Sequence, residues 1–521
     1  MSFNLASMVH ESALAGPDRV CCHLGEDALT YAQLDELSGR VAANLRSAGL
    51  ERGDTVAVQL PNLPQFLVAY FGVLKAGLVM LPMNPLLKAA EISYQLQDAR
   101  ARLFITFAPC LPHAAPAAEE AGGMPIYAVG ELPDPAAAAA SASAADGSAK
   151  FPPPLPFDLL TAAPADSADT DIASMKADDT AVIIYTSGTT GKPKGAELTH
   201  FQLYMNCTTA GNDFGATEDD VTLAVLPLFH IYGLSGMLNV AVRYGAALVL
   251  IPRFDTGLIL DAMERHRVSI FVGVPTMYHA LLAADTTGRD LSSFRLGSSG
   301  GAAMPAAVLY AFEEKFGVSV LEGYGLTETS STATMNRVGD RRPLSIGKPI
   351  WGVEIRIVTP DGAVLPPGPE NIGEILIRGH NVMKGYLRNP DATTEAVRDG
   401  WLHTGDLAYQ DSDGFLFIVD RIKDLIIRGG YNVYPREVEE VLHTHPDVDD
   451  AAVIGRPDER VGQEIIAVVV PRAGTTVDAA GIIDYCRARL ADYKCPREVR
   501  VADAIPRNAS GKPLRRELRT P

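Results

Sequence analysis

The amino-acid sequence predicts an α/β protein. We expect a large N-terminal domain, in which helices cover mainly parallel sheets beside a β-rich part, and a small α+β domain at the C-terminus. Strand and helix patterns alternate over residues 1 to about 105 and again from Thr180, which is typical of parallel sheets covered by helices. A length of 521 residues exceeds one ordinary core and predicts about two to four domains. A hydrophobic fraction of 47% with 21% charged residues indicates a globular chain.

Charge and cysteine content exclude several classes of protein. The 45 Lys and Arg residues and 63 Asp and Glu residues give a net charge of −18, which repels nucleic acid and anionic membranes unless a local basic patch intervenes. The six cysteines form no CxxC pair or zinc-type cluster, which fits a reducing compartment. The N-terminus lacks the pattern of a secretion signal. We therefore expect a cytoplasmic protein without a nucleic-acid partner, and leave peripheral membrane contact and a homodimer open.

The first elements have clear boundary signals. A helix is expected over residues 29–50, with Thr30 as N-cap and Gly49 as its stop. A buried strand over residues 54–62 and a helix over Phe66–Lys75 follow. Composition then changes to Ala, Pro, Ser and Asp over about residues 112–174, which indicates a surface insertion without chemistry.

Two later regions carry informative patterns of charge and of proline. Val221–Val242 contains no charged residue and is long enough to span a bilayer, but its Pro, Gly and Asn residues favour a buried strand, loop and helix. Near the C-terminus, Pro435 is expected to begin a helix over residues 435–446. Strands over 451–455 and 464–470 and a helix over 479–490 complete an α+β unit.

The strongest chemical signal is the segment YTSGTTGKPKG, Tyr185–Gly195, directly after an apolar strand. Its glycines, hydroxyl side chains and two lysines supply the donors and the positive charge that a polyphosphate needs. The segment is not a Walker loop, because only two residues separate Gly188 from Gly191. The alternative, an ordinary surface loop, does not account for the whole string.

This segment resembles the phosphate loop of the acyl-adenylate-forming superfamily, in its acyl-CoA synthetase branch. Five further motifs occur in the family's order: Gly323–Thr329, Thr404–Leu407, Asp420–Asp424, Gly429–Pro435 and Pro506–Leu514. The resemblance implies ATP, Mg²⁺ and coenzyme A as reactants and cofactors, and a carboxylic acid as the other substrate. It also implies an N-terminal domain over 1–420, a hinge over 421–424 and a mobile C-terminal lid over 425–521.

The resemblance assigns a set of residues to the nucleotide. Tyr324 offers an aromatic face to adenine, Thr327 contacts the α-phosphate, and Asp406 binds the ribose hydroxyls with help from Arg421. The whole set is Thr186, Ser187, Gly188, Thr189, Thr190, Gly191, Lys194, Gly300, Gly301, Ala302, Gly323, Tyr324, Gly325, Thr327, Asp406, Arg421 and Lys512.

The resemblance also assigns catalytic, metal and lid residues. Lys512 is expected to bridge the acid and the α-phosphate, while Glu328 and Thr186 hold Mg²⁺, which prefers oxygen ligands. The hinge residue is Lys423, and the coenzyme A tunnel is lined by Gly429, Gly430 and Tyr431.

The residues expected around the acyl group indicate which class of acid is activated. The expected acyl pocket consists of His230, Tyr232, Gly233, Phe271, Val274, Gly325 and Thr329, which are mostly apolar or small. Malonate-specific relatives carry an arginine where Ala280 stands here, and an unpaired carboxylate would be costly in an apolar pocket. We expect a medium-chain or long-chain fatty acid, with an aromatic (coumarate-like) acid as the alternative. A remote alternative is a serine hydrolase, because Gly297–Gly301 matches G-x-S-x-G.

Overall fold

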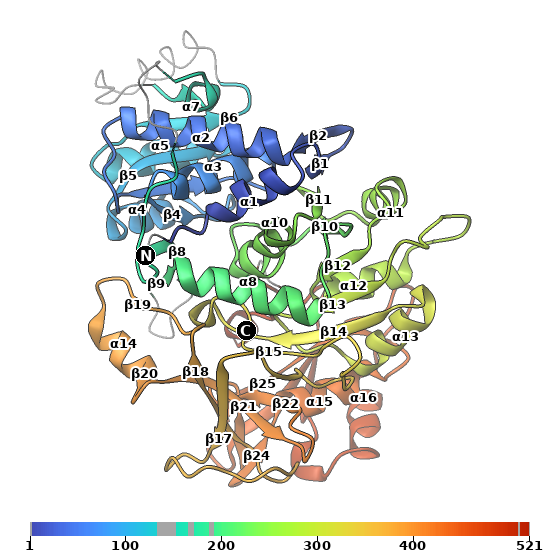
Figure 1. Cartoon of the computed structure of the whole chain (residues 1–521). Coiled ribbons are helices and arrows are strands. Elements are labelled where there is room, and N and C mark those ends of the chain that lie inside the picture. Colours follow the sequence, from blue (N-terminus) through green and yellow to red (C-terminus); the bar gives the residue numbers. More distant parts are fainter. Residues whose placement is uncertain (1–2, 133–152, 165–170, 187–191, 509–510, 520–521) are drawn as a thin grey trace, which may run out of the picture.

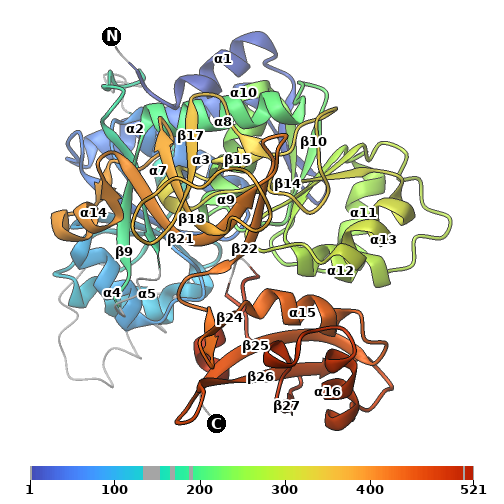
Figure 2. The same cartoon turned by 90° about the horizontal axis from the view of Figure 1, so that it is seen from below.

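A computed structural model describes residues 3–132, 153–164, 171–186, 192–508 and 511–519 (Figure 1). Three sheets form the large N-terminal domain and a fourth forms the small C-terminal domain. Figure 2 shows the small domain on one side of the large one, joined to it after β22 (Leu416–Arg421). The predicted fold class, α/β with a β-rich part and a smaller α+β domain, is confirmed.

The largest sheet has nine strands, and its central strands are parallel. In spatial order they are β16 (Lys348–Pro349), β15 (Thr334–Met335), β14 (Ser319–Tyr324), β13 (Leu296–Ser299), β12 (Ile270–Gly273), β10 (Val221–Ala224), β11 (Ala247–Leu250), β1 (Val20–Leu24) and β2 (Asp27–Thr30). The carboxyl ends of β13 and β14 meet at one edge, which is where ligands bind in sheets of this kind.

The second sheet has eight strands and is parallel except at β8–β9 and β9–β19. In spatial order they are β19 (Gly385–Tyr386), β9 (Lys194–Thr199), β8 (Thr180–Thr186), β4 (Val79–Pro82), β3 (Thr55–Gln59), β5 (Ala101–Phe107), β6 (Ile126–Val129) and β7 (Leu155–Pro156). A third, antiparallel sheet contains β17 (Val353–Val358), β18 (Gly373–Gly379), β21 (Trp401–Gln410), β20 (Val397–Arg398) and β22.

Helices cover both large sheets (Figure 1). They are α1 (Ser7–Ala15), α2 (Tyr31–Ser47), α3 (Pro64–Lys75), α4 (Ala89–Asp98), α5 (Leu111–Glu120), α7 (Asp158–Thr161), α8 (His200–Phe214), α9 (Ile231–Gly233), the π-helical η2 (Leu234–Asn239), α10 (Val240–Tyr244), α11 (Thr256–Arg265), α12 (Pro275–Ala283), α13 (Ala306–Phe316) and α14 (Pro390–Ala396).

The prediction of a surface insertion over 112–174 was partly wrong. Within it, α5 packs against α4, and β6 and β7 extend the eight-stranded sheet in parallel register. Alanine favours helix, and Ala114, Ala117 and Ala118 of α5 are buried in a local core instead of lying on the surface. Residues 133–152 and 165–170 of this region lie outside the described part.

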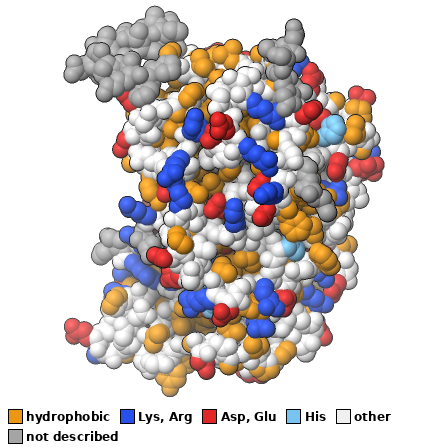
Figure 3. Space-filling model, turned by 60° about the vertical axis from the view of Figure 1, so that its left-hand side comes forward, with side chains coloured by type: hydrophobic (Ala, Val, Ile, Leu, Met, Phe, Trp, Pro, Cys, Tyr) orange, Lys and Arg blue, Asp and Glu red, His pale blue; other side chains and the backbone are white. Residues whose placement is uncertain are grey.

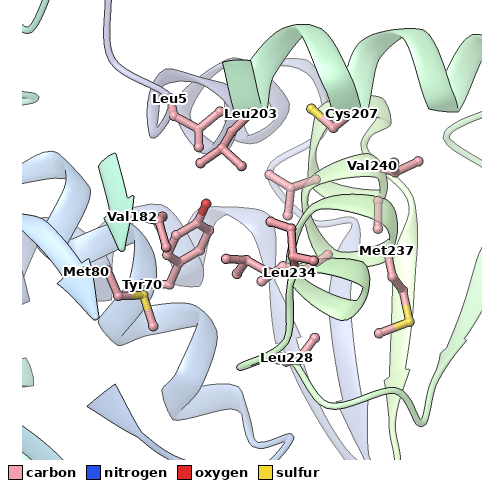
Figure 4. Packing of buried hydrophobic residues seen from close by; sticks show 14 of the residues in the cluster. Leu5, Tyr70, Met80, Val182, Leu203, Cys207, Leu228, Leu234, Met237 and Val240 are labelled. Atoms are coloured by element: carbon pink, nitrogen blue, oxygen red, sulfur yellow. The ribbon is translucent and has the colours of Figure 1, made fainter. Parts of the chain in front are cut away.

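The uncharged stretch Val221–Val242 is a strand, a loop and a short helical run, as predicted. It begins as β10 and continues through α9, η2 and α10. Figure 4 shows Leu234 and Met237 of η2 beside Leu203 and Cys207 of α8 and Tyr70 of α3, all in the main core. Among the described helices, none is both long and apolar enough to cross a membrane.

The small domain has its own core. Its sheet contains β24 (Tyr431–Val433), β23 (Ile426–Arg428), β26 (Gly462–Pro471), β25 (Val448–Asp458) and β27 (Glu498–Val501). Helices α15 (Pro435–His443) and α16 (Ala479–Arg487) pack on it, and α17 (Arg515–Leu518) ends the described chain. Pro435 is the first residue of α15, as predicted.

Side chains of both signs are interspersed on the face of the molecule drawn in Figure 3, which shows no uniform basic area among its described residues.

A buried ion pair joins α2 to α3. The Lys75 ammonium, 3% exposed, donates to the carboxylate of Asp35 at 2.5 Å and to its carbonyl oxygen at 2.7 Å. Helix α2 starts at a capping box between Thr30 and Gln33, which confirms the predicted N-cap. The capped helix therefore presents Asp35 to Lys75 at a fixed place.

We expect Asp35→Ala to lower the free energy of unfolding by about 3 kcal/mol, because it leaves the buried Lys75 charge without its partner. The measurement is urea denaturation followed by fluorescence and circular dichroism. The control is Glu36→Ala, which removes an exposed ion pair with Arg40 on the same helix and should cost at most about 0.5 kcal/mol. Equal losses in both variants would contradict this account.

Candidate functional site

Two adjoining cavities, of about 480 and 510 Å³, lie at the carboxyl ends of the central strands and against the small domain. Both are lined by Tyr324 and Lys512, although these residues belong to different domains. Of the residues predicted for the site, the following line one or both cavities: Thr186, Lys194, His230, Tyr232, Gly300, Gly301, Ala302, Gly323, Tyr324, Gly325, Thr327, Glu328, Asp406, Arg421, Lys423 and Lys512. The structure thus brings together residues from five of the six motifs, whereas no residue of Gly429–Pro435 lines either cavity.

The predicted phosphate loop connects two paired strands. Thr186 ends β8 and lies opposite Lys194, which begins β9. Both side chains line the larger cavity, so both ends of the loop face it. The predicted residues Ser187, Gly188, Thr189, Thr190 and Gly191 lie outside the described part of the chain.

A tyrosine that the sequence analysis did not identify holds the proposed metal-binding acid. The Tyr386 hydroxyl donates to Glu328 Oε1 at 2.8 Å, and the Lys194 ammonium lies 5.2 Å from the centre of the Tyr386 ring. Burial and the Glu328 carboxylate raise the pKa of Tyr386, so its hydroxyl stays a donor. Tyr386 lies outside every motif, and only the pairing of β19 with β9 brings it here.

The oxygen donors at this end fit a hard cation. A carboxylate from Glu328 and a hydroxyl from Thr186 are the ligand types that Mg²⁺ takes, usually with waters and substrate phosphates completing its shell. The described residues contain no cluster of three or more His, Cys, Asp or Glu side chains, so they offer no all-protein metal cage.

Asp406 is buried at 3% exposure, and its carboxylate is held by one hydrogen bond and one ion pair. The Tyr324 hydroxyl donates to Oδ2 at 2.6 Å, and Arg421 Nε contacts Oδ1 at 2.8 Å from the neighbouring strand. Together these contacts fix the orientation of the Asp406 carboxylate and of the Tyr324 ring at the cavity wall. Gly325, beside it, must be glycine, since a Cβ there would lie 1.5 Å from the Ser331 carbonyl oxygen.

Lys512 is carried into this site by the small domain. Burial lowers the pKa of its ammonium to about 7, the nearby Arg421 and Lys423 act in the same direction, and Asp406 and Asp424 oppose them. A desolvated ammonium next to two other cations attracts an anionic ligand strongly, because its charge is not compensated by water.

His230 is a neutral hydrogen-bond donor at the other side of the larger cavity. Burial lowers its pKa to about 4, so the ring is uncharged at pH 7. Nδ1 accepts the Tyr232 backbone N–H at 3.3 Å, which puts the remaining ring proton on Nε2. His230 can therefore donate to a carboxylate oxygen.

Tyr232 forms part of the acyl side. A Cβ on Gly236 would lie 2.9 Å from the Tyr232 ring, and one on Gly300 would lie 3.0 Å from it, so both glycines leave room for this ring. The Tyr232 hydroxyl lies 3.2 Å from Ser298 Oγ. The remaining lining here includes Phe214, Ile231, Ser331, Thr332 and Met335.

Four residues predicted for the acyl pocket do not line either cavity. Phe271 and Val274 are 0% and 2% exposed and pack in hydrophobic cores. Gly233 approaches the Pro227 carbonyl, and Thr329 hydrogen-bonds to Leu326. Phe271 of β12 and Val274 before α12 therefore support the cavity wall from behind.

The G-x-S-x-G match does not produce a nucleophile. Ser298 and Ser299 are both buried at 1% exposure. Ser298 Oγ contacts the Tyr232 hydroxyl, and Ser299 Oγ has no partner among the described residues. Neither contacts an imidazole there, so the serine hydrolase alternative finds no support.

The small domain is held by contacts on both sides of the predicted hinge. Arg436 donates to the carbonyl oxygen of Ile418 at 2.6 Å, and its backbone N–H donates to Asp420 at 3.0 Å. His279 of α12 lies 3.8 Å from Asp449 of the small domain. Lys423 is exposed in the turn between β22 and β23.

Gly429, Gly430 and Tyr431, predicted for the coenzyme A tunnel, are exposed and line neither cavity. The present orientation thus presents Lys512 to the site and leaves the glycine pair away from it.

Comparisons with known proteins agree along the whole chain. A model of the AMP-binding enzyme family matches residues 9–387, and one of the AMP-binding enzyme C-terminal domain matches residues 437–512. A feruloyl-CoA synthase from Amycolatopsis is 37% identical over 99% of this chain and 98% of its own length. A long-chain-fatty-acid–CoA ligase from Bacillus subtilis is 36% identical over 99% of this chain and 94% of its own.

Solved structures show the same similarity. The anthranilate CoA ligase AuaEII in complex with anthranoyl-AMP superposes with a TM-score of 0.90 at 30% identity, covering 100% of this chain and 97% of its own. ATP-bound MatB from Rhodopseudomonas palustris gives a TM-score of 0.87 at 34% identity, with 100% and 98% covered. The chain therefore belongs to the AMP-binding enzymes of the acyl-adenylate-forming superfamily, as an acid–CoA ligase that acts through an acyl-adenylate.

Proposed function

We propose that the protein joins an apolar monocarboxylic acid to coenzyme A in two steps that use two orientations of the small domain. The observation that carries this is that Lys512 of the small domain lines both cavities, of which Asp406 lines one and Glu328 the other.

In the first step a carboxylate oxygen of the acid attacks the α-phosphorus of ATP. An O–P bond forms to give acyl-AMP, and pyrophosphate leaves. Lys512 offsets the repulsion between the two anions, and His230 donates from Nε2 to the carboxylate. Asp406 accepts hydrogen bonds from the ribose hydroxyls, for which a carboxylate is a suitable acceptor. Bound Mg²⁺, held by Glu328 and Thr186, would withdraw charge from the phosphates.

In the second step the sulfur of coenzyme A attacks the acyl carbon: a C–S bond forms, the C–O bond to AMP breaks, AMP leaves, and the thiol proton is released to solvent. The small domain must turn about Lys423 to present Gly429, Gly430 and Tyr431, because Lys512 occupies the site in the present orientation. That turn breaks the contacts of Arg436 with Ile418 and Asp420, which lie before the hinge.

The acid is proposed to be a medium-chain or long-chain fatty acid. Phe214, Ile231 and Met335 give the acyl side an apolar lining. The lysines and arginines that line this cavity come from the phosphate loop, β20, the hinge region and the lid, so none is placed for a second carboxylate. An aromatic acid is the second candidate, favoured by the hydroxyl groups of Tyr232, Ser298 and Ser331, which could bind ring substituents.

A panel of acids tests the proposed substrate. With Mg-ATP and coenzyme A, we expect AMP release to have its highest kcat/KM with octanoate or palmitate, because the acyl side is apolar. Higher values with coumarate, ferulate or benzoate would establish the second candidate. Preference for malonate or oxalate, or release of ADP and orthophosphate, would contradict the proposal.

Glu328→Gln should raise the Mg²⁺ requirement and slow adenylation at least ~10-fold, about 1.4 kcal/mol of barrier. Glutamine keeps an oxygen for the Tyr386 hydroxyl but removes the charge that holds the metal. The measurement is the Mg²⁺ titration of acid-dependent pyrophosphate release. The control, Tyr386→Phe, removes the hydrogen bond but keeps the charge and should change the titration less. An unchanged titration in Glu328→Gln would remove this residue from the metal site.

Lys512→Ala should slow adenylation ~10²-fold or more, because a buried cation aimed at developing negative charge is lost. The same variant should convert supplied acyl-AMP and coenzyme A to thioester at close to the normal rate. Lys423→Pro should show the converse pattern, since proline restricts the turn of the hinge. Equal losses in both half-reactions, with circular dichroism unchanged, would contradict the alternation of the lid.

A further inference from the structure

Lys512 lies in a segment near the C-terminus whose described residues, 506–508 and 511–514, bond to one another; we call it the Lys512 turn. Arg507 and Pro513 form an isolated bridge, and the Lys512 backbone N–H donates to the Asn508 side chain at 2.9 Å. The Leu514 N–H donates to the Pro506 carbonyl at 2.8 Å. No ion pair to the Lys512 ammonium is found among the described residues, so the position of this ammonium depends on how the turn is held.

Arg515 fixes one end of this turn. Its Nη2 atom contacts both oxygens of Glu439 at 2.7 and 2.9 Å, and Nη1 lies 3.3 Å from Asp424. Nε donates to the Val453 carbonyl oxygen at 3.2 Å. The three charged side chains are 11–13% exposed, against 22–25% for the pair of Arg507 and Asp450 at the other end of the turn.

The partners of Arg515 connect the turn to the hinge. Glu439 lies on α15 and accepts the Val453 N–H of β25 at 2.7 Å, so it belongs to the rigid part of the lid. Asp424 closes the DRIKD motif directly after Lys423, and its carboxylate partly opposes the lowering of the Lys512 pKa by burial. The Arg515 guanidinium therefore joins the lid core, the hinge segment and the Lys512 turn. It does so as one planar group with several donors, and lysine has no such group.

We propose that Arg515 is a positioning residue for adenylation: it fixes the Lys512 turn to Glu439 and Asp424, so that rotation at the hinge delivers the ammonium to one place in the cavity. This inference rests on the proposed function of Lys512. All of the contacts lie after Lys423 and turn with the lid, so they persist in the second orientation. There Lys512 has left the site, and its exact placement no longer affects the reaction.

The test is Arg515→Lys, which keeps the charge but not the fork of donors. We expect adenylation to fall by about tenfold, as pyrophosphate release shows, whereas conversion of supplied acyl-AMP to thioester stays within about twofold. Glu439→Gln should act in the same direction. Arg516→Ala, an exposed neighbour on the same short helix, is the matched control and should leave both half-reactions unchanged.

A double-mutant cycle separates positioning from folding. If Arg515 acts through Lys512, Arg515→Lys should have no further effect on adenylation in a Lys512→Ala background. Additive losses, or equal losses in both half-reactions of Arg515→Lys, would overturn the proposal, and so would unchanged adenylation in Arg515→Lys. If Lys512→Ala itself leaves adenylation unchanged, the proposed function fails instead.

Discussion

The electrostatic repulsion between a carboxylate and a polyphosphate is the constraint on which this structure depends. The chain itself carries a net charge of −18, so its overall field opposes both ligands. Positive charge must therefore be supplied locally, and the two cavities receive it from Lys194 at the phosphate loop, Arg421 at the start of the hinge and Lys512 after the hinge. A cation on the small domain can leave the site between the two half-reactions. A cation on a sheet of the large domain would stay there.

The carboxylates at the cavity wall are themselves held in place by neighbouring side chains. Asp406 is bound by Tyr324 and Arg421, and Glu328 is bound by Tyr386, so each acid is held in one orientation at the cavity wall. In the lid, Asp450 pairs with Arg507 and Glu439 pairs with Arg515. These pairs hold the turn that carries Lys512. Ion pairs inside the lid turn with it, whereas the bonds of Arg436 to β22 belong to one orientation only.

Much of this arrangement could be predicted from the sequence, and the limits have physical causes. Thr30 and Pro435 mark helix starts through local bonding, so they were recognised correctly. The motif residues stand in short strings with characteristic chemistry, and the structure places most of those it describes along the two cavities. Residues 112–132 were misjudged, because burial of alanines depends on what packs over them. Tyr386 was missed because strand pairing brings it to Glu328. Phe271 was expected in the acyl pocket but packs in a core, because a sequence pattern does not show whether a side chain faces the cavity or the core behind its wall.

The central claim is that the present orientation of the small domain serves the first half-reaction only. His279 and Asp449 face each other across the two domains at 3.8 Å, so His279→Cys with Asp449→Cys can be bridged by a short bismaleimide. The bridged enzyme should still release pyrophosphate with acid and Mg-ATP, but should not convert acyl-AMP and coenzyme A to thioester. Each single variant treated with the same reagent should keep both half-reactions. Thioester formation by the bridged enzyme at the rate of the single variants would contradict the claim.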